Sequence, residues 1–419
     1  MRNTLETISQ GYDIYSSRRP EFSTQNRLPF RVSPLPLSLT REQKSGLSNL
    51  GQDVVSYLRV CDELYHSDAR LRHILDKGKP EIFLVDRPAN YLFVRPDIII
   101  TPSGFAMCEI ETSPFGLALA EILNKAYRYK NIETMVGEND LSSYIHEAVP
   151  SDGTILFSDK TRAYKGQLMF LADKTFSSEN RKWKAEYVTE IGPGMNDNIY
   201  RAFYLSEYVT DSSVRLLFDG YKGNQTIILP SLTPHMEEKA VLALLWDKRW
   251  ENIFRKQLGP AAFNHLKAVI PATWIVGEEK YFAPGLPGGI ESSVDLALLS
   301  RSKRAYVLKT SGFSAHSSWG EGVTFLHDKS REQAKEKLHR TATDESTLHV
   351  IQEFRKAVNI PLFYESEDGI HPMSARIRIT PYYATLPANE GRMIAIKATG
   401  VENTDYIHAS SESINTAVS

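Results

Sequence analysis

Three carboxylates and one guanidinium occur within one short stretch of the chain, at spacings that suit a β-hairpin: Arg95, Asp97, Glu109 and Glu111. A turn at residues 102–104 places Asp97 opposite Glu109 on the paired strand. The same register places Arg95 opposite Glu111. Side chains alternate between the two faces of a strand, so all four lie on one side, with opposed Cβ atoms about 5 Å apart. We therefore expect a compact acidic patch.

A bound divalent cation is the favoured explanation of this patch. One arginine cannot neutralise three carboxylates, and like charges held this close repel one another. Oxygen ligands suit Mg²⁺, which binds through one or two carboxylates together with substrate phosphates. The alternative is a pair of cross-strand salt bridges on a solvated face. The opposite face of the ribbon is apolar and can pack: Ile98, Ile100, Ala106, Cys108 and Ile110.

The spacing resembles the magnesium site of the glutathionylspermidine synthase type of ATP-grasp ligase. The shared pattern is R-x-D, eleven residues, then E-x-[N/E] and a Thr/Ser-Pro, matched here by Thr112-Ser113-Pro114. The resemblance implies that Asp97, Glu109 and Glu111 hold Mg²⁺. It also implies that Arg95 steadies the phosphoryl group during transfer. The chain departs from the family at Glu111, where Asn is usual, and the added charge would tighten the metals or alter the acceptor pocket.

Two lysines are candidates for contacts with nucleotide phosphates. Lys239 lies in the segment His235–Asp247, which resembles the family's S-N-K-A-I-L-P-L-L-W-E segment, whose lysine contacts those phosphates. Taken alone, a lysine at the start of an apolar helix is more often a solvated end residue. Lys309 ends the strand Tyr306–Lys309 and leads directly into a loop rich in glycine and serine.

The loop after Lys309 can form a flap over phosphates. Its glycines, Gly312, Gly320 and Gly322, allow backbone N–H groups to wrap phosphate oxygens. It is not a Walker A loop, because the Gly-Lys-Ser/Thr order is absent. It resembles the K-P-x-x-G-R-x-G-x-x-V run of ATP-grasp enzymes, although it is longer and lacks the arginine. The alternative is a generic glycine-rich surface loop.

The strand Leu348–Phe354 resembles the family strand that lines the adenine and ends in a hinge. The resemblance assigns Gln352, Glu353 and Phe354 to the nucleotide site. A core strand with a polar end is the alternative. The order along the chain reinforces the separate resemblances, since it runs from helix lysine to strand lysine, glycine flap, helix and hinge strand.

Other polar side chains give weaker indications. Arg376 and Arg378 alternate on one strand and share a face, so both guanidiniums are candidates to clamp a carboxylate or phosphate, and Arg376 is the one assigned a catalytic role. A solvated strand face is the alternative. Four histidines are scattered and show no metal-ligand spacing: His235, His316, His371 and His408.

The elements that must position these residues alternate between helices and strands. Apolar residues recur in steps of three and four from Arg41 to Lys77, which predicts a long packing helix. The alternation predicts an α+β fold, which the resemblance makes ATP-grasp-like, with mixed sheets flanked by helices around a nucleotide cleft. Strands are expected at 81–85, 91–101, 105–111, 154–157, 167–171, 214–218, 226–229, 305–309, 323–326, 348–354, 374–383 and 393–398. Further helices are expected at 117–129, 237–258, 292–300 and 330–339.

Composition narrows the function classes. The 419 residues carry a net charge of −2, which gives no basic footprint for nucleic acid or an anionic membrane surface. No stretch approaches the roughly 18 apolar residues that span a bilayer. Cys61 and Cys108 form no disulfide framework, so we expect a cytoplasmic protein. We expect an N-terminal arm over 1–40, a lobe with the acidic hairpin over 41–235, and ATP-grasp nucleotide lobes over 236–419.

The expected function is that of an ATP-dependent ligase with ATP and Mg²⁺ as cofactors. It would join a small carboxylate, such as an amino acid or small peptide, to an amine through an acyl phosphate. The sequence leaves open whether the protein forms a homodimer. Two alternatives remain: a non-catalytic nucleotide-binding regulatory protein and a small-molecule kinase.

Overall fold

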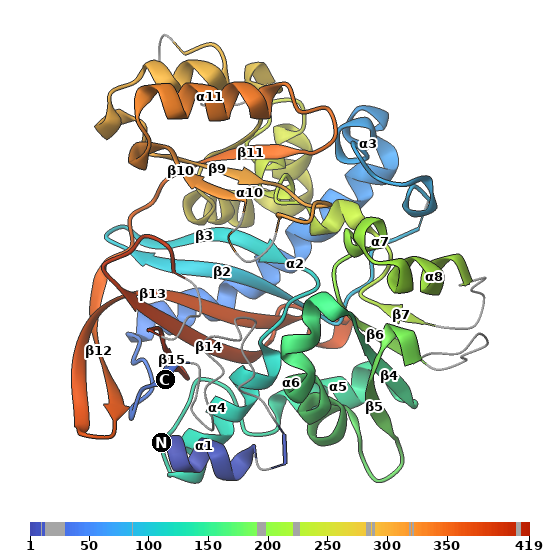
Figure 1. Cartoon of the computed structure of the whole chain (residues 1–419), viewed down its shortest axis with the longest axis vertical. Coiled ribbons are helices and arrows are strands. Elements are labelled where there is room, and N and C mark those ends of the chain that lie inside the picture. The colour runs from blue at the N-terminus through green and yellow to red at the C-terminus, as the bar shows by residue number, and fades with distance from the viewer. Residues whose placement is uncertain are drawn as a thin grey trace.

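The computed structural model describes residues 1–9, 11–12, 30–85, 87–190, 198–220, 227–281, 286, 290–317, 320, 322–407 and 412–419. These residues form three sheets with helices around them (Figure 1). Residues 318, 319 and 321 of the predicted flap, and His408, lie outside the described residues.

The largest sheet takes its strands from both ends of the chain. Its order is β1-β15-β14-β13-β2-β3, and β12 pairs with another stretch of β13. β1 and β15 run parallel, and the other pairs are antiparallel. The acidic hairpin therefore lies at one edge of this sheet, beside β13. The strands are β1 (Arg31–Val32), β2 (Phe93–Thr101), β3 (Gly104–Glu111), β12 (Asn359–Ser366), β13 (Gly369–Ala384), β14 (Met393–Glu402) and β15 (Ile414–Thr416).

The hairpin of β2 and β3 has the predicted pairing at its acidic end. Arg95 pairs with Glu111, and Asp97 pairs with Glu109. The predicted three-residue turn is wrong by one residue. Thr101 pairs directly with Gly104, so the turn consists of residues 102 and 103. A β-bulge beside Asp97 adds one residue to β3 and restores the expected register.

Helices cover both faces of the large sheet. On one face lies α2 (Arg41–Ser67), whose start is fixed by a capping box between Thr40 and Gln43. α10 (Glu251–Val269) packs against α2 and β3. On the other face lies α4 (Leu117–Tyr129), which matches the predicted helix and packs against α1 (Arg2–Ile8). Strand residues alternate between the two cores: Ile98, Ile100, Ile377 and Ile379 join α2, while Phe93, Tyr382 and Ala395 join α4.

The second sheet is antiparallel and has the order β10-β9-β11-β8. Figure 1 shows it above the large sheet, with α11 over it. Its strands confirm the expected positions around 305–309, 323–326 and 348–354, and α11 confirms the expected helix near 330–339. The elements are β8 (Thr273–Ile275), β9 (Tyr306–Thr310), β10 (Val323–Phe325), β11 (His349–Glu353) and α11 (Arg331–Ala342).

The prediction of one long helix at 237–258 is wrong. The chain instead forms a 3₁₀ turn at Pro234–Glu237, then α9 (Val241–Leu244) and the separate helix α10. The break has a local cause: the Asp247 carboxylate accepts a hydrogen bond of 2.8 Å from the backbone N–H of Arg249, which competes with helix pairing. The helix expected at 292–300 is a 3₁₀ turn at Ser293–Leu298.

The third sheet is parallel, with the order β5-β4-β6-β7. The strand expected at 154–157 is confirmed as β4. Two apolar runs expected as strands are helical instead, since 167–171 belongs to α6 and 214–218 to α8, and the run at 81–85 forms a 3₁₀ turn. The strands of this sheet are β4 (Gly153–Phe157), β5 (Trp183–Tyr187), β6 (Asn198–Ala202) and β7 (Ile228–Leu229). The remaining helices of the described chain are α3 (Ala69–Leu75), α5 (Asp140–Ala148), α6 (Lys165–Leu171), α7 (Glu207–Thr210) and α8 (Ser212–Gly220).

Parts of the expected N-terminal arm are built into the fold. Leu5 of α1 is fully buried, and β1 pairs with β15, while residues 13–29 lie outside the described residues. The large sheet takes strands from both sides of the predicted division at residue 235. Across the described part of the chain, no helix is long and apolar enough to cross a membrane.

Candidate active site

Arg95 joins the two acidic strands of the hairpin. Its guanidinium lies 3.3 Å from the Asp97 carboxylate and 2.8 Å from the Glu111 carboxylate. It also donates a hydrogen bond of 2.7 Å to the backbone carbonyl of Phe115, just before α4. The Tyr382 hydroxyl donates to the same carbonyl, also at 2.7 Å. These contacts fix a buried arginine between two carboxylates.

Strands β13 and β14 add two cations that face the hairpin. Arg378 donates a hydrogen bond of 3.0 Å to Asp97. Lys397 is buried on β14 and donates to the Thr399 hydroxyl at 3.3 Å. The sheet order explains why Arg378 and Lys397 lie near the hairpin, because β13 lies between β2 and β14.

The second sheet and the segment before α9 add two lysines. The Lys239 ammonium lies 2.9 Å from the Glu109 carboxylate and donates at 2.6 Å to the Ser317 carbonyl in the flap loop. Lys309 donates to the Cys108 carbonyl at 2.9 Å and to the Gln352 side chain at 2.7 Å. The predicted phosphate lysines therefore both reach the acidic hairpin.

The carboxylates respond to burial and to their neighbours in opposite ways. Burial alone would raise the pKa of Asp97, but the nearby cations, led by Arg378 and Arg95, outweigh it and lower that pKa. Burial raises the pKa of Glu111 to about 7, and Glu109 and Asp97 add to the rise, against the opposing effect of Arg95.

Lys397 and Lys309 are shifted toward their neutral forms. Burial lowers the pKa of Lys397 to about 7, and the positive charges of Arg378 and Arg95 add to this effect. Burial also lowers the pKa of Lys309, while the Cys108 thiol and Glu109 oppose the change. Both groups can therefore exchange protons closer to neutral pH than an exposed lysine can.

The site leaves hydrogen-bonding atoms of both kinds unsatisfied. Asp97 Oδ1 and Glu111 Oε2 are buried and have no hydrogen-bond partner among the described residues. Arg95 Nε and Arg378 Nε are likewise buried without one in that part of the chain. Asp97 Oδ1 and Arg95 Nε nevertheless lie 3.3 Å apart as an ion pair. Glu111 Oε2 and Arg378 Nε therefore remain the unsatisfied atoms of this group, and an unsatisfied buried polar atom costs about 1 to 3 kcal/mol.

The described glycines of the predicted flap make specific contacts. Gly312 lies so close to Glu238 that an added Cβ would meet its carboxylate at 2.6 Å. Gly320 has a φ of +80° and its carbonyl accepts a hydrogen bond from Tyr406. The Gly322 carbonyl accepts from the backbone N–H of Thr310 at 2.9 Å. Nucleotide contact by this loop stays a prediction.

The remaining predicted residues fall into two groups. Gln352 joins the site through Lys309, whereas the Glu353 carboxylate pairs with Arg355 at 2.8 Å. Phe354 packs edge-on against Phe325, with ring centroids 5.7 Å apart.

Arg376 does not contact the hairpin carboxylates; it pairs with Asp405 instead. The cause is register: Arg378 pairs with Ile99 and reaches Asp97 diagonally, while Arg376 lies two residues farther along the strand.

Two cations of the site were not selected from the sequence. The sequence offers Arg378 beside Arg376 as a candidate for an anion clamp, but it does not place Arg378 at the hairpin. Lys397 carries a usable signal, since it interrupts an otherwise apolar strand, where a charged residue is rarely buried without a partner. The sequence argument that one arginine faces three carboxylates is thereby corrected, because Lys239, Arg378 and Lys397 also surround them.

Two known structures are similar to the chain. A glutathione synthetase-like effector from Globodera pallida has a TM-score of 0.52 and 12% identity, over 93% of this chain and 90% of that chain. A protein described as a gamma-glutamylcysteine synthetase from Methylobacillus flagellatus has a TM-score of 0.45 and 11% identity, over 88% of each chain. The first likeness shows a common fold. No protein-family model and no curated protein matches the chain. The finer resemblance to glutathionylspermidine synthases stays a prediction.

Proposed function

We propose that the chain is an ATP-dependent ligase of the ATP-grasp type, which joins a carboxylate to an amine with Mg²⁺ as cofactor. The observation that carries the proposal is the pair of unsatisfied groups in one buried site. The buried Glu111 Oε2 oxygen can bind a cation, and the buried Arg378 Nε nitrogen can bind an anion. Magnesium-bound triphosphate presents both kinds of group at once.

The donor set fits magnesium. Asp97, Glu109 and Glu111 offer hard oxygen ligands on one face of the hairpin, and Mg²⁺ prefers one or two carboxylates together with phosphate oxygens. When bound, the ion would neutralise charge on the transferring phosphoryl group. Glu111 has a pKa of about 7 as the chain stands, so a bound cation would favour its charged form.

The surrounding cations fit the phosphates. Lys239 and Lys309 come from the segment before α9 and from β9, and both lie against the hairpin. Arg95 and Arg378 approach from β2 and β13. The cationic side chains outnumber the carboxylates, which leaves positive charge to stabilise the transferred group.

The reaction then follows in two steps. An oxygen of the substrate carboxylate attacks the γ-phosphorus, the bond to the β-phosphate oxygen breaks, and ADP leaves. The amine nitrogen next attacks the acyl carbon, inorganic phosphate leaves with the bonding electrons, and the nitrogen loses a proton. Arg95, Arg378 and the lysines hold the phosphoryl oxygens, and no covalent enzyme nucleophile is required. The loop after Lys309 would exclude water from the acyl phosphate.

The likeness in fold adds support. The Globodera pallida effector is named as glutathione synthetase-like, and its fold extends over nearly the whole of this chain. Because function depends on the site rather than the fold, the substrates must be found by experiment. We propose a small carboxylate, such as an amino acid or short peptide, and a small amine as the two partners.

An ATP-consumption screen tests the proposal. Purified protein is incubated with ATP, Mg²⁺ and pairs of amino acids, short peptides and amines, and products are identified by mass spectrometry. We expect ADP, phosphate and an amide to form in equal amounts. The Asp97→Asn variant should lose this activity, whereas Asp368→Asn, in the exposed turn between β12 and β13, should keep it.

Two outcomes would contradict the ligase. A stable phosphorylated product without an amide would indicate a small-molecule kinase. Tight ATP binding without ADP release for any pair would indicate a nucleotide-binding protein that does not catalyse ligation.

A further inference from the structure

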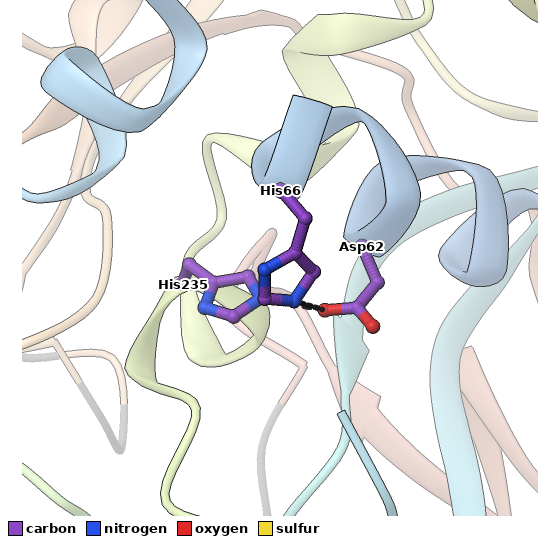
Figure 2. A group of neighbouring side chains, drawn as sticks. All are labelled: Asp62, His66 and His235. Carbon is purple, nitrogen blue, oxygen red and sulfur yellow. Dashed lines mark hydrogen bonds and ion pairs between the residues drawn. The ribbon is translucent and has the colours of Figure 1, made fainter. Parts of the chain in front are cut away.

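Two imidazoles and one carboxylate converge away from the acidic hairpin. Asp62 and His66 lie one turn apart near the end of α2, and His235 lies in the 3₁₀ turn Pro234–Glu237. His235 Nε2 is 2.8 Å from Asp62 Oδ1, and His66 Nε2 is 3.4 Å from the same oxygen. Figure 2 shows both rings turned toward Asp62. All three ligand atoms lie within 4.8 Å of one another.

Neighbouring groups hold these side chains in place. The backbone N–H of Ala89 donates to Asp62 Oδ2 at 2.9 Å, which orients Oδ1 toward the imidazoles. The His235 ring stacks on Tyr65, with centroids 3.7 Å apart and planes 5° from parallel. Supporting contacts of this kind fix ligand orientation in metal sites. The side chains are 3% exposed at His235, 13% at Asp62 and 22% at His66, and both ring nitrogens of His66 are buried.

Simple histidine–carboxylate pairs elsewhere in the chain look different. His265 lies 2.6 Å from Asp53, and His349 lies 2.9 Å from Asp344, with one imidazole on each carboxylate. At Asp62 two imidazoles approach one oxygen. A single carboxylate oxygen shared by two rings is the arrangement that a cation between them would complete.

We propose that Asp62, His66 and His235 form a binding site for a divalent transition metal, with Zn²⁺ as the best-fitting ion. Two imidazole nitrogens and one carboxylate oxygen suit this ion, and water takes the fourth position. In a tetrahedral site with bonds of about 2.0 Å, ligand atoms lie about 3.3 Å apart. The two separations between an imidazole nitrogen and Asp62 Oδ1, 2.8 and 3.4 Å, lie near this value, and rotations of the side chains would admit the ion.

The ion would join two segments that are distant in the sequence. Asp62 and His66 belong to α2, while His235 precedes Lys239, which contacts the acidic hairpin. The ion would therefore link the 3₁₀ turn Pro234–Glu237 to α2. The cation Lys79 near His235 is compensated by Glu238 at 2.6 Å, so it does not leave an uncompensated charge beside the ion. The proposed site shares no residue with the ATP site and does not rest on ligase activity.

Direct metal binding tests the proposal. Tag-free protein is stripped with a chelator and titrated with Co²⁺, followed by its visible absorption bands, and with Zn²⁺ in competition with a chromophoric chelator. We expect one ion per chain, a tetrahedral Co²⁺ spectrum, and a higher unfolding temperature with Zn²⁺, since ligands that bind the folded state stabilise it.

Variants locate the site. Asp62→Asn, His66→Gln and His235→Gln should each weaken Zn²⁺ binding by at least about tenfold. His265→Gln, also an imidazole paired with a carboxylate, should bind as the wild type does. The proposal is overturned if the wild type takes up no stoichiometric metal, or if the His66→Gln/His235→Gln double variant binds as tightly. Should a variant fail to fold by circular dichroism, the wild-type stoichiometry and Co²⁺ spectrum decide.

Discussion

The guanidinium of Arg378 donates a hydrogen bond of 3.0 Å to the carboxylate of Asp97, which lies 281 residues earlier in the chain. Asp97 is 6% exposed and also contacts Arg95. This pairing makes the acidic hairpin dependent on β13, and it separates Arg378 from its neighbour Arg376, whose partner is Asp405.

We expect Arg378→Met to destabilise the protein far more than Arg376→Met. Loss of one partner from a buried ion pair costs up to about 3 kcal/mol, and here it leaves the buried Asp97 carboxylate with Arg95, at 3.3 Å, as its remaining ion-pair partner. Asp405, the partner of Arg376, is 25% exposed, so that loss should stay below about 1 kcal/mol. Urea unfolding of both variants measures the difference. Equal losses would show that Asp97 does not depend on Arg378.

Lys309→Met and Lys239→Met should each weaken ATP binding by about 10- to 100-fold. A hydrogen bond to a charged group contributes about 1.5 to 3 kcal/mol, which corresponds to that range. Calorimetric titration with a non-hydrolysable ATP analogue and Mg²⁺ provides the measurement. Lys184→Met, which alters a half-exposed lysine on β5, is the control and should bind normally. Unchanged affinity in both site variants would remove these lysines from the phosphate site.

Glu111 should give a distinctive pH dependence. Its folded pKa of about 7 is raised above the usual 4.5, so the folded state holds a proton that the unfolded chain releases between those values. The stability from this group is complete below about pH 4.5 and is lost as the pH rises through 7. Glu111→Gln should therefore gain stability relative to wild type between pH 5 and about 7. Urea unfolding of both proteins at several pH values in this window measures the difference in their unfolding free energies. A difference that does not change with pH would exclude the raised pKa of Glu111.

Two glycines of α2 should respond oppositely to alanine. A Cβ on Gly51 would lie 2.1 Å from the Gly391 carbonyl and 2.5 Å from the Tyr383 ring, so Gly51→Ala should destabilise the protein by about 3 kcal/mol. A Cβ on Gly46 would meet Phe105 at an ordinary 3.6 Å. Gly46→Ala should therefore stabilise the helix by up to about 1 kcal/mol. Thermal and urea unfolding compare the two, and similar effects would contradict the close approach of α2 to the sheet.

The local pattern predicted the hairpin well because its pairs depend on strand alternation. Arg95–Glu111 and Asp97–Glu109 follow from period two, and the bulge beside Asp97 compensates for the shorter turn. The prediction of strands at 167–171 and 214–218 was wrong, because an apolar run of five residues does not distinguish a strand from a buried helix.

The rest of the site could not be read from single segments. Arg378 and Lys397 reach the hairpin through the order of strands in the large sheet, and nothing near Asp97 in the sequence encodes that order. The spacing of Asp62 and His66 on one helix face was available, but the third ligand atom comes from His235, 173 residues after Asp62. Long-range pairing of this kind depends on tertiary packing.

The sheet order also has a consequence for biosynthesis. While a ribosome is still translating the segment before β13, the emerged hairpin carries Asp97, Glu109 and Glu111 without Arg378 or Lys397. Its edge is open and its like charges repel, so the nascent protein should expose this ribbon to proteases and chaperones until translation of the last strands. Assembly of the proposed ATP site therefore waits until β13 and β14 have been synthesised.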